Sequence, residues 1–350
     1  MIKDHNQKQE GGDSSTNLQG QTIVINQGIS YADAKEIAID VYQANFLKLS
    51  QVAETTAKAR VEEITELFFS KLQKEHPEGI GNAHNPDFQY ALFTVQKEYA
   101  KTGDKALGDL LVDLLVDRSK QQQRNILQIV LNEALSTAPK LTDSQLAVLA
   151  VKFLFGYTQH LSVGNHDLLG QYFDKFIAPL SSKIVKNQAA FQHLEYAGCG
   201  SVGTFPNALA SILGSTYQGL FLKGFDQKEV VDRSISLGLD QQFFIGCLND
   251  PSKTQVNALN KDGLSKKFEE VGVTEEDRSK ISALFELGKM SETEIRDKCI
   301  EVRPYMADIF DCWESSSMGR LTLTSVGIAI GHANIKRFAG EFADLAIWIN

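Results

Sequence analysis

Proline and cysteine are both scarce in this chain. Only 7 of its 350 residues are proline, so few positions force a helix to break, and the abundant Leu, Ala, Gln, Lys and Glu favour helix. The four cysteines form no CxxC pair and lie far apart, at Cys199, Cys247, Cys299 and Cys312. We therefore expect buried thiols in a reducing cytosol rather than a disulfide framework.

An excess of positive charge and an apolar leader are also missing. The net charge of -9 argues against a general nucleic-acid binder, because phosphate neutralisation needs clustered Lys and Arg. Residues 1–13 are polar and charged, without the apolar run of a secretory signal, so we expect a disordered tail and a cytoplasmic protein. The chain is 43% hydrophobic and 23% charged, as is ordinary for a soluble globular protein.

Residues 16–27 have the composition of a short β segment without an obvious local partner. Thr22, Ile23, Val24 and Ile25 favour the pleated state, and an isolated strand is marginal in water. Stacked copies from several chains would satisfy its backbone and form Gln and Asn ladders. We predict self-assembly through this segment, with docking on the chain's own helical body as the alternative. The self-assembly residues would be Leu18, Gln19, Gln21, Ile23, Val24 and Ile25.

Residues 29–76 contain neither Gly nor Pro. Apolar residues recur there every three or four positions, and Ser30 followed by Asp33 resembles a helix-capping box. One unbroken helix over residues 30–74 would be about 67 Å long and suits a coiled coil. A bend near Asn45 or Ser50 would instead give two packed helices, and the sequence leaves both possibilities open.

The remaining pattern predicts a mainly α protein in three parts: a helical bundle with a long N-terminal helix, a short N-terminal β segment and a small C-terminal two-stranded β element. The parts are 1–28, a tail and β oligomerisation segment; 29–197, a helical domain; and 198–350, a second helical domain. That last domain ends with strands 320–323 and 345–349, which could pair antiparallel and clasp the helix between them. We expect the other helices near residues 86–101, 104–120, 122–137, 142–156, 166–178, 181–196, 226–237, 240–248, 264–271, 274–287, 291–302 and 304–314.

The best candidate for catalysis is the turn Gly198-Cys199-Gly200. A thiol between glycines can act as a nucleophile if a base lowers its pKa, and His193 with Glu195 could supply that base. The alternative, which we favour, is a glycine-rich helix terminus with a small buried cysteine. The chain has no HExxH motif, P-loop or dinucleotide fingerprint, so we expect no cofactor and no metal, and a protein that is more plausibly not an enzyme.

Residues 196–222 carry no charge and are long enough to span a bilayer, but they include glycines, a proline and many hydroxyls. We favour a buried core helix plus loop, with conditional membrane contact as the alternative. The Gly327-xxx-Gly331 spacing is a close-packing motif of membrane helices, here expected to serve packing inside a soluble domain.

Both ends of the chain resemble a family of uncharacterised bacterial helical proteins. The family's S-x-N-x-Q strand and G-I-S-Y-x-D-A helix start match residues 15–19 and 28–34, and its L-T-x-x-G and D-L-x-I-W-I tail matches 323–327 and 344–349. The L-T-x-x-G element is also faintly similar to the tail of alpha-type abortive-infection proteins. The resemblance covers most of the chain, implies a bacterial or phage-related cytoplasmic protein in antiviral defence, and assigns no catalytic residue.

Two main function hypotheses follow. The first is a self-assembling antiviral defence component, abortive-infection-like, whose partner is itself. The second is a non-enzymatic helical scaffold or adaptor that binds another protein. A thiol enzyme using Cys199 is a weaker third.

Overall fold

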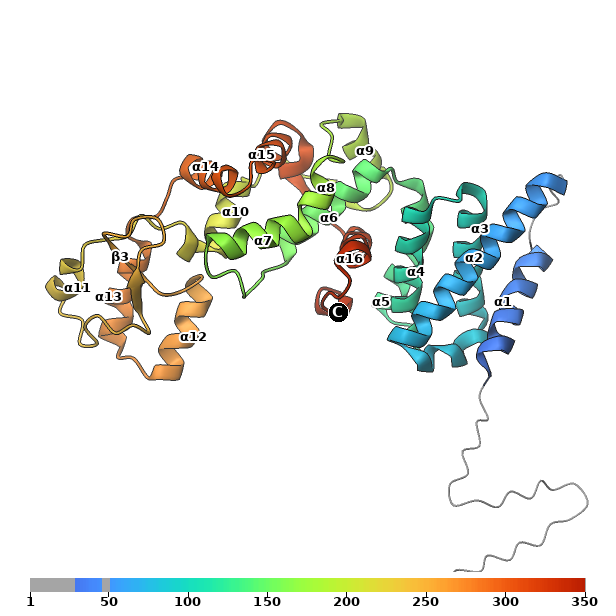
Figure 1. Cartoon of the computed structure of the whole chain (residues 1–350), viewed down its shortest axis with the longest axis horizontal. Coiled ribbons are helices and arrows are strands. Elements are labelled where there is room, and N and C mark those ends of the chain that lie inside the picture. The colour runs from blue at the N-terminus through green and yellow to red at the C-terminus, as the bar shows by residue number, and fades with distance from the viewer. Residues whose placement is uncertain (1–28, 46–50, 350) are drawn as a thin grey trace, which may run out of the picture.

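The computed structural model describes residues 29–45 and 51–349 and confirms a mainly α protein. The predicted β segment and its six self-assembly residues lie outside these ranges. Figure 1 shows an arched, elongated molecule, with α1 to α5 at one end and α11 to α13 at the other. Helices α6 to α10 and α14 to α16 lie between the two ends, and the C-terminus lies beside α16.

The glycine-free stretch after residue 28 forms two packed helices, α1 (Tyr31–Asn45) and α2 (Gln51–Glu75). The rings of Tyr31 and Phe69 lie 5.7 Å apart, and the Tyr31 hydroxyl donates to Glu66 at 2.9 Å. The predicted cap is present: the Asp33 backbone N–H donates to Ser30 Oγ, and the Ser30 N–H donates to the Asp33 carboxylate. Of the two possibilities that the sequence left open, two packed helices is the one observed.

Helices continue with short connections through the middle of the chain. Thr142 caps α6 as predicted, in a capping box with Gln145. The elements of this part are η1 (Pro77–His84), α3 (Pro86–Thr102), α4 (Lys105–Ser119), α5 (Ile126–Thr137), η2 (Ala138–Lys140), α6 (Asp143–Tyr157), α7 (His166–Phe176), α8 (Ala178–Ser181) and α9 (Gln188–Tyr196).

The second half mixes helices with four very short strands. Its elements are β1 (Gly200–Val202), α10 (Leu209–Thr216), η3 (Gln218–Leu220), α11 (Lys228–Asp232), β2 (Phe244–Gly246), β3 (Thr254–Val256), α12 (Lys261–Val271), α13 (Glu275–Glu286), α14 (Glu292–Val302), α15 (Met306–Ser315), η4 (Ser317–Arg320), β4 (Leu321–Leu323), α16 (Ser325–Ala339) and η5 (Leu345–Ile347). The helix predicted over 240–248 is wrong, because β2 lies there and pairs antiparallel with β3.

The predicted strand at residues 320–323 is confirmed as β4, but its predicted partner is wrong. β4 pairs antiparallel with β1, with Gly200 opposite Leu323. Residues 345–347 instead form the 3₁₀ helix η5, because Asp344 accepts from the Ala346 N–H at 2.8 Å and starts a tight turn. The closing β element therefore joins segments about 120 residues apart instead of clasping α16.

Helix α16 lies in the centre of the molecule and packs against α4, α5 and α6. The Gly327 and Gly331 spacing makes this approach possible. A Cβ at Gly331 would lie 2.8 Å from the Leu149 carbonyl oxygen, and one at Gly327 would lie 1.9 Å from the Cys199 carbonyl oxygen. Both glycines thus serve close packing inside the globular structure, as predicted.

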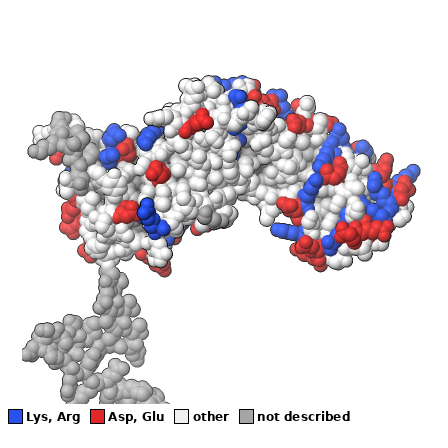
Figure 2. Space-filling view, turned by 180° about the vertical axis from the view of Figure 1, so that it is seen from behind, with Lys and Arg blue, Asp and Glu red and all other residues white. Residues whose placement is uncertain are grey.

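The hydrophobic core has two large clusters. The first runs from α1 through α10 and takes in α14 to α16, so the predicted boundary between residues 197 and 198 falls within it. The second is confined to side chains between Leu222 and Phe285. Figure 2 shows acidic and basic side chains crowding the end of the molecule formed by α11 to α13, whereas the middle of that face carries few. The three-part domain division itself stays a prediction.

The uncharged residues 196–222 form β1, α10 and η3. Leu209, Leu213, Leu220 and Phe221 are buried in the first cluster, which is the core helix plus loop that we favoured. None of the helices within residues 29–45 and 51–349 is long and apolar enough to cross a membrane.

Candidate functional site

The thiol of Cys199 is fully buried beneath α16. Burial raises its pKa to about 11, so the thiol is protonated at neutral pH. Its hydrogen bond goes to the Ala197 carbonyl oxygen, 3.9 Å from Sγ, and its own carbonyl accepts from the Thr324 N–H. This environment is typical of a structural cysteine rather than of a nucleophile.

The two predicted partners of Cys199 make their hydrogen bonds to other residues. His193 Nδ1 lies 2.9 Å from Gln145 Nε2, and Glu195 Oε1 accepts from the Val202 N–H at 3.0 Å. Glu195 therefore closes the free edge of β1. The three side chains lie near one another in sequence, but within the described residues no hydrogen bond joins them into a nucleophile and base.

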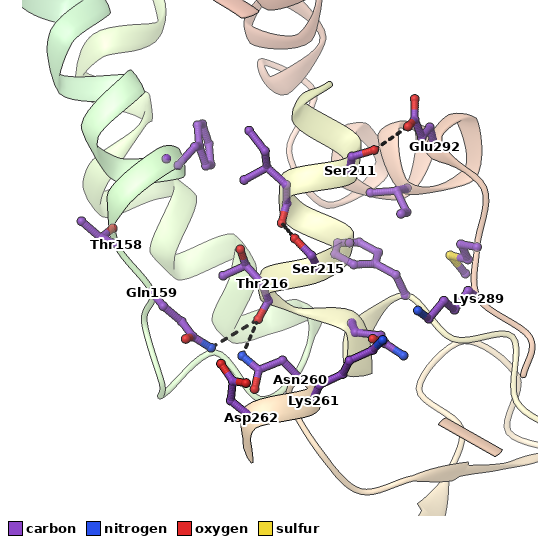
Figure 3. A pocket seen from close by; sticks show the side chains of 18 of the residues that line it. Thr158, Gln159, Ser211, Ser215, Thr216, Asn260, Lys261, Asp262, Lys289 and Glu292 are labelled. Carbon is purple, nitrogen blue, oxygen red and sulfur yellow. Dashed lines mark hydrogen bonds between the residues drawn. The ribbon is translucent and has the colours of Figure 1, made fainter. Parts of the chain in front are cut away.

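A groove of about 860 Å³ lies at the edge of the first hydrophobic cluster, next to the start of α12. Four elements form it: the C-terminal end of α6, α10, and the N-terminal ends of α12 and α14 (Figure 3). Its apolar surface comes from Phe155, Ile212, Phe221, Met290 and Ile295. Hydroxyl and amide side chains surround this surface, contributed by Thr158, Gln159, Ser211, Ser215, Thr216 and Asn260.

The rim of the groove is held by hydrogen bonds between the elements. The Thr216 carbonyl oxygen accepts from Gln159 Nε2 at 3.3 Å and from Asn260 Nδ2 at 3.2 Å, which ties α6 and α12 to the end of α10 (Figure 3). Across the groove, the Ser211 hydroxyl donates to Glu292 of α14. The polar wall is therefore preformed, as a binding groove requires.

Charge on the rim is balanced within the protein. Lys261 and Lys289 both pair with Glu286, at 3.3 and 2.6 Å. Burial alone would raise the pKa of Glu286, but hydrogen bonds from Lys289 and Lys261 outweigh burial and lower it. The carboxylate therefore stays ionised at neutral pH. The lining itself holds two lysines, Lys261 and Lys289, and two carboxylates, Asp262 and Glu292, so the groove has no strong field of one sign.

This arrangement is suited to binding rather than to bond making. Thr158, Ser211 and Ser215 donate their hydroxyl protons within the protein, so their oxygens remain as acceptors for the N–H groups of an extended polypeptide. The apolar surface supplies places for side chains. Within the described residues no group of three or more His, Cys, Asp or Glu is placed to hold a metal ion.

Comparison with known proteins places the chain in a family. A family model described as ":-like" matches residues 28–349. The chain belongs to this family. The resemblance to an uncharacterised family over most of the chain is thereby confirmed, whereas the similarity to abortive-infection tails is not shown. No curated protein and no solved structure matches the chain.

The groove was not predicted from the sequence. Its lining residues run from Phe155 to Ile295 on four separate elements, and no short motif links them. One signal was available: the uncharged residues 196–222 contain α10, whose Ser211, Ser215 and Thr216 form one wall. A helix rich in small polar residues inside an uncharged stretch presents hydrogen-bonding groups without the charge of a solvated surface.

Proposed function

We propose that the protein is a non-enzymatic helical adaptor that binds an extended segment of another polypeptide. The observation that carries this proposal is the 860 Å³ groove with an apolar surface and a wall of hydroxyl and amide groups. The groove is lined by residues of the first core cluster and by Asn260, Lys261 and Asp262 at the start of α12, so a segment bound there contacts both α10 and α12. Binding would therefore also stiffen their connection.

The test uses a substitution that fills the groove without touching the core. Ser215 is exposed on α10, and Ser215→Arg would place a long side chain across the groove. Ser282→Arg is the matched control, because Ser282 is an exposed serine on α13 and does not line the groove. Both variants add the same charge and the same volume.

Peptides selected from a random display library on the full chain would be measured by fluorescence anisotropy. We expect Ser215→Arg to weaken binding by about tenfold or more, which corresponds to about 1.4 kcal/mol, and Ser282→Arg to leave it unchanged. Failure to select any peptide, or equal binding to both variants, would remove the support for this proposal.

Self-assembly belongs to the same proposal as its second element. It rests on the β-favouring composition of residues 16–27, and assembly would multiply the number of grooves presented by one particle. Antiviral defence, a cytoplasmic location, a coiled coil and conditional membrane contact stay predictions drawn from the sequence. A defence role would be tested by phage plating on cells that express the wild type or Ser215→Arg.

A further inference from the structure

The segment that follows α16 forms a strap along that helix. After α16 the chain turns at Gly340, where φ is +83°, and runs back as residues 341–349, here called the C-terminal strap. His332 Nε2–H donates to the Ala343 carbonyl oxygen at 2.7 Å, and Trp348 Nε1–H donates to the Tyr157 carbonyl oxygen at 2.7 Å. Leu345 and Ile349 of the strap are buried.

The strap separates two hollows of different chemistry. On one side lies a groove of about 760 Å³ whose lining carries charges of both signs, among them Lys74, Lys120, Lys336, Glu75 and Asp117. On the other lies a hollow of about 600 Å³ lined by aromatic rings, among them Tyr157, His160, Phe176 and Trp348. Strap residues 341–343 line both. Movement of the strap would therefore join a charged groove to an aromatic one.

The charged groove is built on a buried ionic network between α2, α4 and α16. Lys336 Nζ lies 2.8 Å from Glu75, 3.3 Å from Asp117 and 3.6 Å from Asp113. Lys71 Nζ lies 2.6 Å from Asp113 Oδ1. The two lysines therefore balance most of the charge of these three carboxylates.

Two buried acceptors among the residues that line this groove have no hydrogen-bond partner within the described part of the chain: Asp117 Oδ2 and His332 Nδ1. Asp117 is 7% exposed and His332 is 2% exposed. Because Nε2 of His332 carries the proton donated to Ala343, Nδ1 has a free lone pair. Burial lowers the pKa of His332, which keeps the ring neutral at pH 7.

Unpaired buried acceptors are costly, at about 1–3 kcal/mol each, and a ligand that donates to both would recover this free energy. The donors should be neutral, because Lys120 and Lys336 already balance the charge of Asp117. They should sit on a flat ring, because the neighbouring hollow is aromatic. An anionic tail is accommodated by Lys74, which is exposed and has no ion pair among the residues that the structure describes.

We propose that the C-terminal strap covers a binding site for a guanine nucleotide, with the base donating to Asp117 Oδ2 and His332 Nδ1. Guanine presents two adjacent neutral donors, N1–H and the 2-amino group, on a planar ring. Both acceptors are shielded from solvent, and Ala343 of the strap lies against His332, so the strap moves when the nucleotide enters. This site is separate from the proposed polypeptide groove and stands without it.

Titration calorimetry of the full chain with GDP, IDP and UDP tests the proposal. IDP lacks the 2-amino group, so we expect it to bind about tenfold or more weakly than GDP, a difference of about 1.4 kcal/mol. Hydrogen exchange of residues 340–349 should change when GDP is added. Equal affinity for GDP and IDP would overturn the proposal. So would the absence of GDP binding at about millimolar concentration, where a dissociation constant corresponds to a binding free energy of only about -4 kcal/mol.

Two variants locate the site. His332→Phe keeps a ring in the aromatic cluster but removes the acceptor, and it should reduce the preference for GDP over IDP. Lys74→Glu changes an exposed side chain, so it should weaken GDP binding with an unchanged melting temperature even if His332→Phe folds poorly. Lys266→Glu, an exposed lysine on α12, is the control. GDP binding that Lys74→Glu leaves unaltered would place the ligand elsewhere.

Discussion

Lys152 is a lysine buried in the core without a counter-charge among the residues that the structure describes. It is 4% exposed on α6, and its ammonium lies 4.2 Å from the centroid of the Trp313 ring. Burial lowers its pKa from the ordinary 10.5 to about 8. The change corresponds to about 3 kcal/mol. The cation–π contact with Trp313 is worth about 0.5–2 kcal/mol and offsets part of this penalty.

Replacing Lys152 by Met should therefore stabilise the protein. Methionine has a similar length, carries no charge and packs well against an aromatic ring. We expect a gain of about 2 kcal/mol in the free energy of unfolding at pH 7, where both folded and unfolded states hold the lysine proton. Urea denaturation followed by tryptophan fluorescence measures this gain. Lys266→Met, at an exposed lysine of α12, should change stability by less than about 0.5 kcal/mol.

The dependence on pH identifies the cause. Between the folded pKa of about 8 and the unfolded value of 10.5, the unfolded state binds the proton more strongly, so wild-type stability gains with rising pH. The advantage of Lys152→Met over the wild type should shrink across the same window. A destabilised Lys152→Met variant, or an advantage that stays constant from pH 7 to about 10.5, would refute the reasoning.

Three further outcomes are expected. Gly327→Ala should lower the free energy of unfolding by about 1–3 kcal/mol or more, because its Cβ would lie 1.9 Å from the backbone oxygen of Cys199. Gly81→Ala is the control in the same urea assay, because a Cβ at Gly81 meets nothing within 4 Å. The free energy of unfolding should fall as the pH drops from 7 to about 5. Burial lowers the pKa of three histidines in the folded state, so the unfolded state binds protons at a higher pH than the folded state does. A urea midpoint that does not move over this range would contradict the prediction. These histidines are His160, His166 and His332. By light scattering, the full chain should form a defined oligomer, and a chain lacking residues 1–28 should form a smaller species. If both chains are monomers, the full chain at 38.7 kDa, self-assembly through that segment is disproved.

The sequence predicted the helical elements well because their signals are local. The Ser30 and Thr142 caps and the three-to-four-residue apolar spacing lie within each segment, and all appear in the structure. The pairing of β1 with β4 was out of reach, because Gly200 and Leu323 have no local relation. Residues 345–349 have β-favouring side chains, yet the turn at Asp344 and burial against α16 override that propensity.

The candidate sites were harder to predict than the fold. A thiol between glycines can be exposed, which made Cys199 a candidate nucleophile. In the structure Gly200 instead allows β1 to approach β4, because a Cβ at this position would lie only 2.7 Å from the Thr322 carbonyl oxygen. One feature of the sequence does indicate the buried ionic network. Asp113 and Asp117 stand four residues apart in an otherwise apolar part of α4, so both carboxylates share a buried face and require partners.

Those partners show that the effect of a buried charge on stability depends on whether opposite charges surround it. Lys336 is nearly as inaccessible as Lys152, but carboxylates from α2 and α4 surround it, and despite burial their charges raise the pKa of Lys336. Removing Lys336 would leave carboxylates buried and unpaired, whereas removing Lys152 relieves a penalty. Because the Lys336 pairs all reach α2 or α4, they fix how α16 sits against the N-terminal helices. The C-terminal strap follows α16 and is bonded to it at His332, so the network that positions α16 also positions the strap.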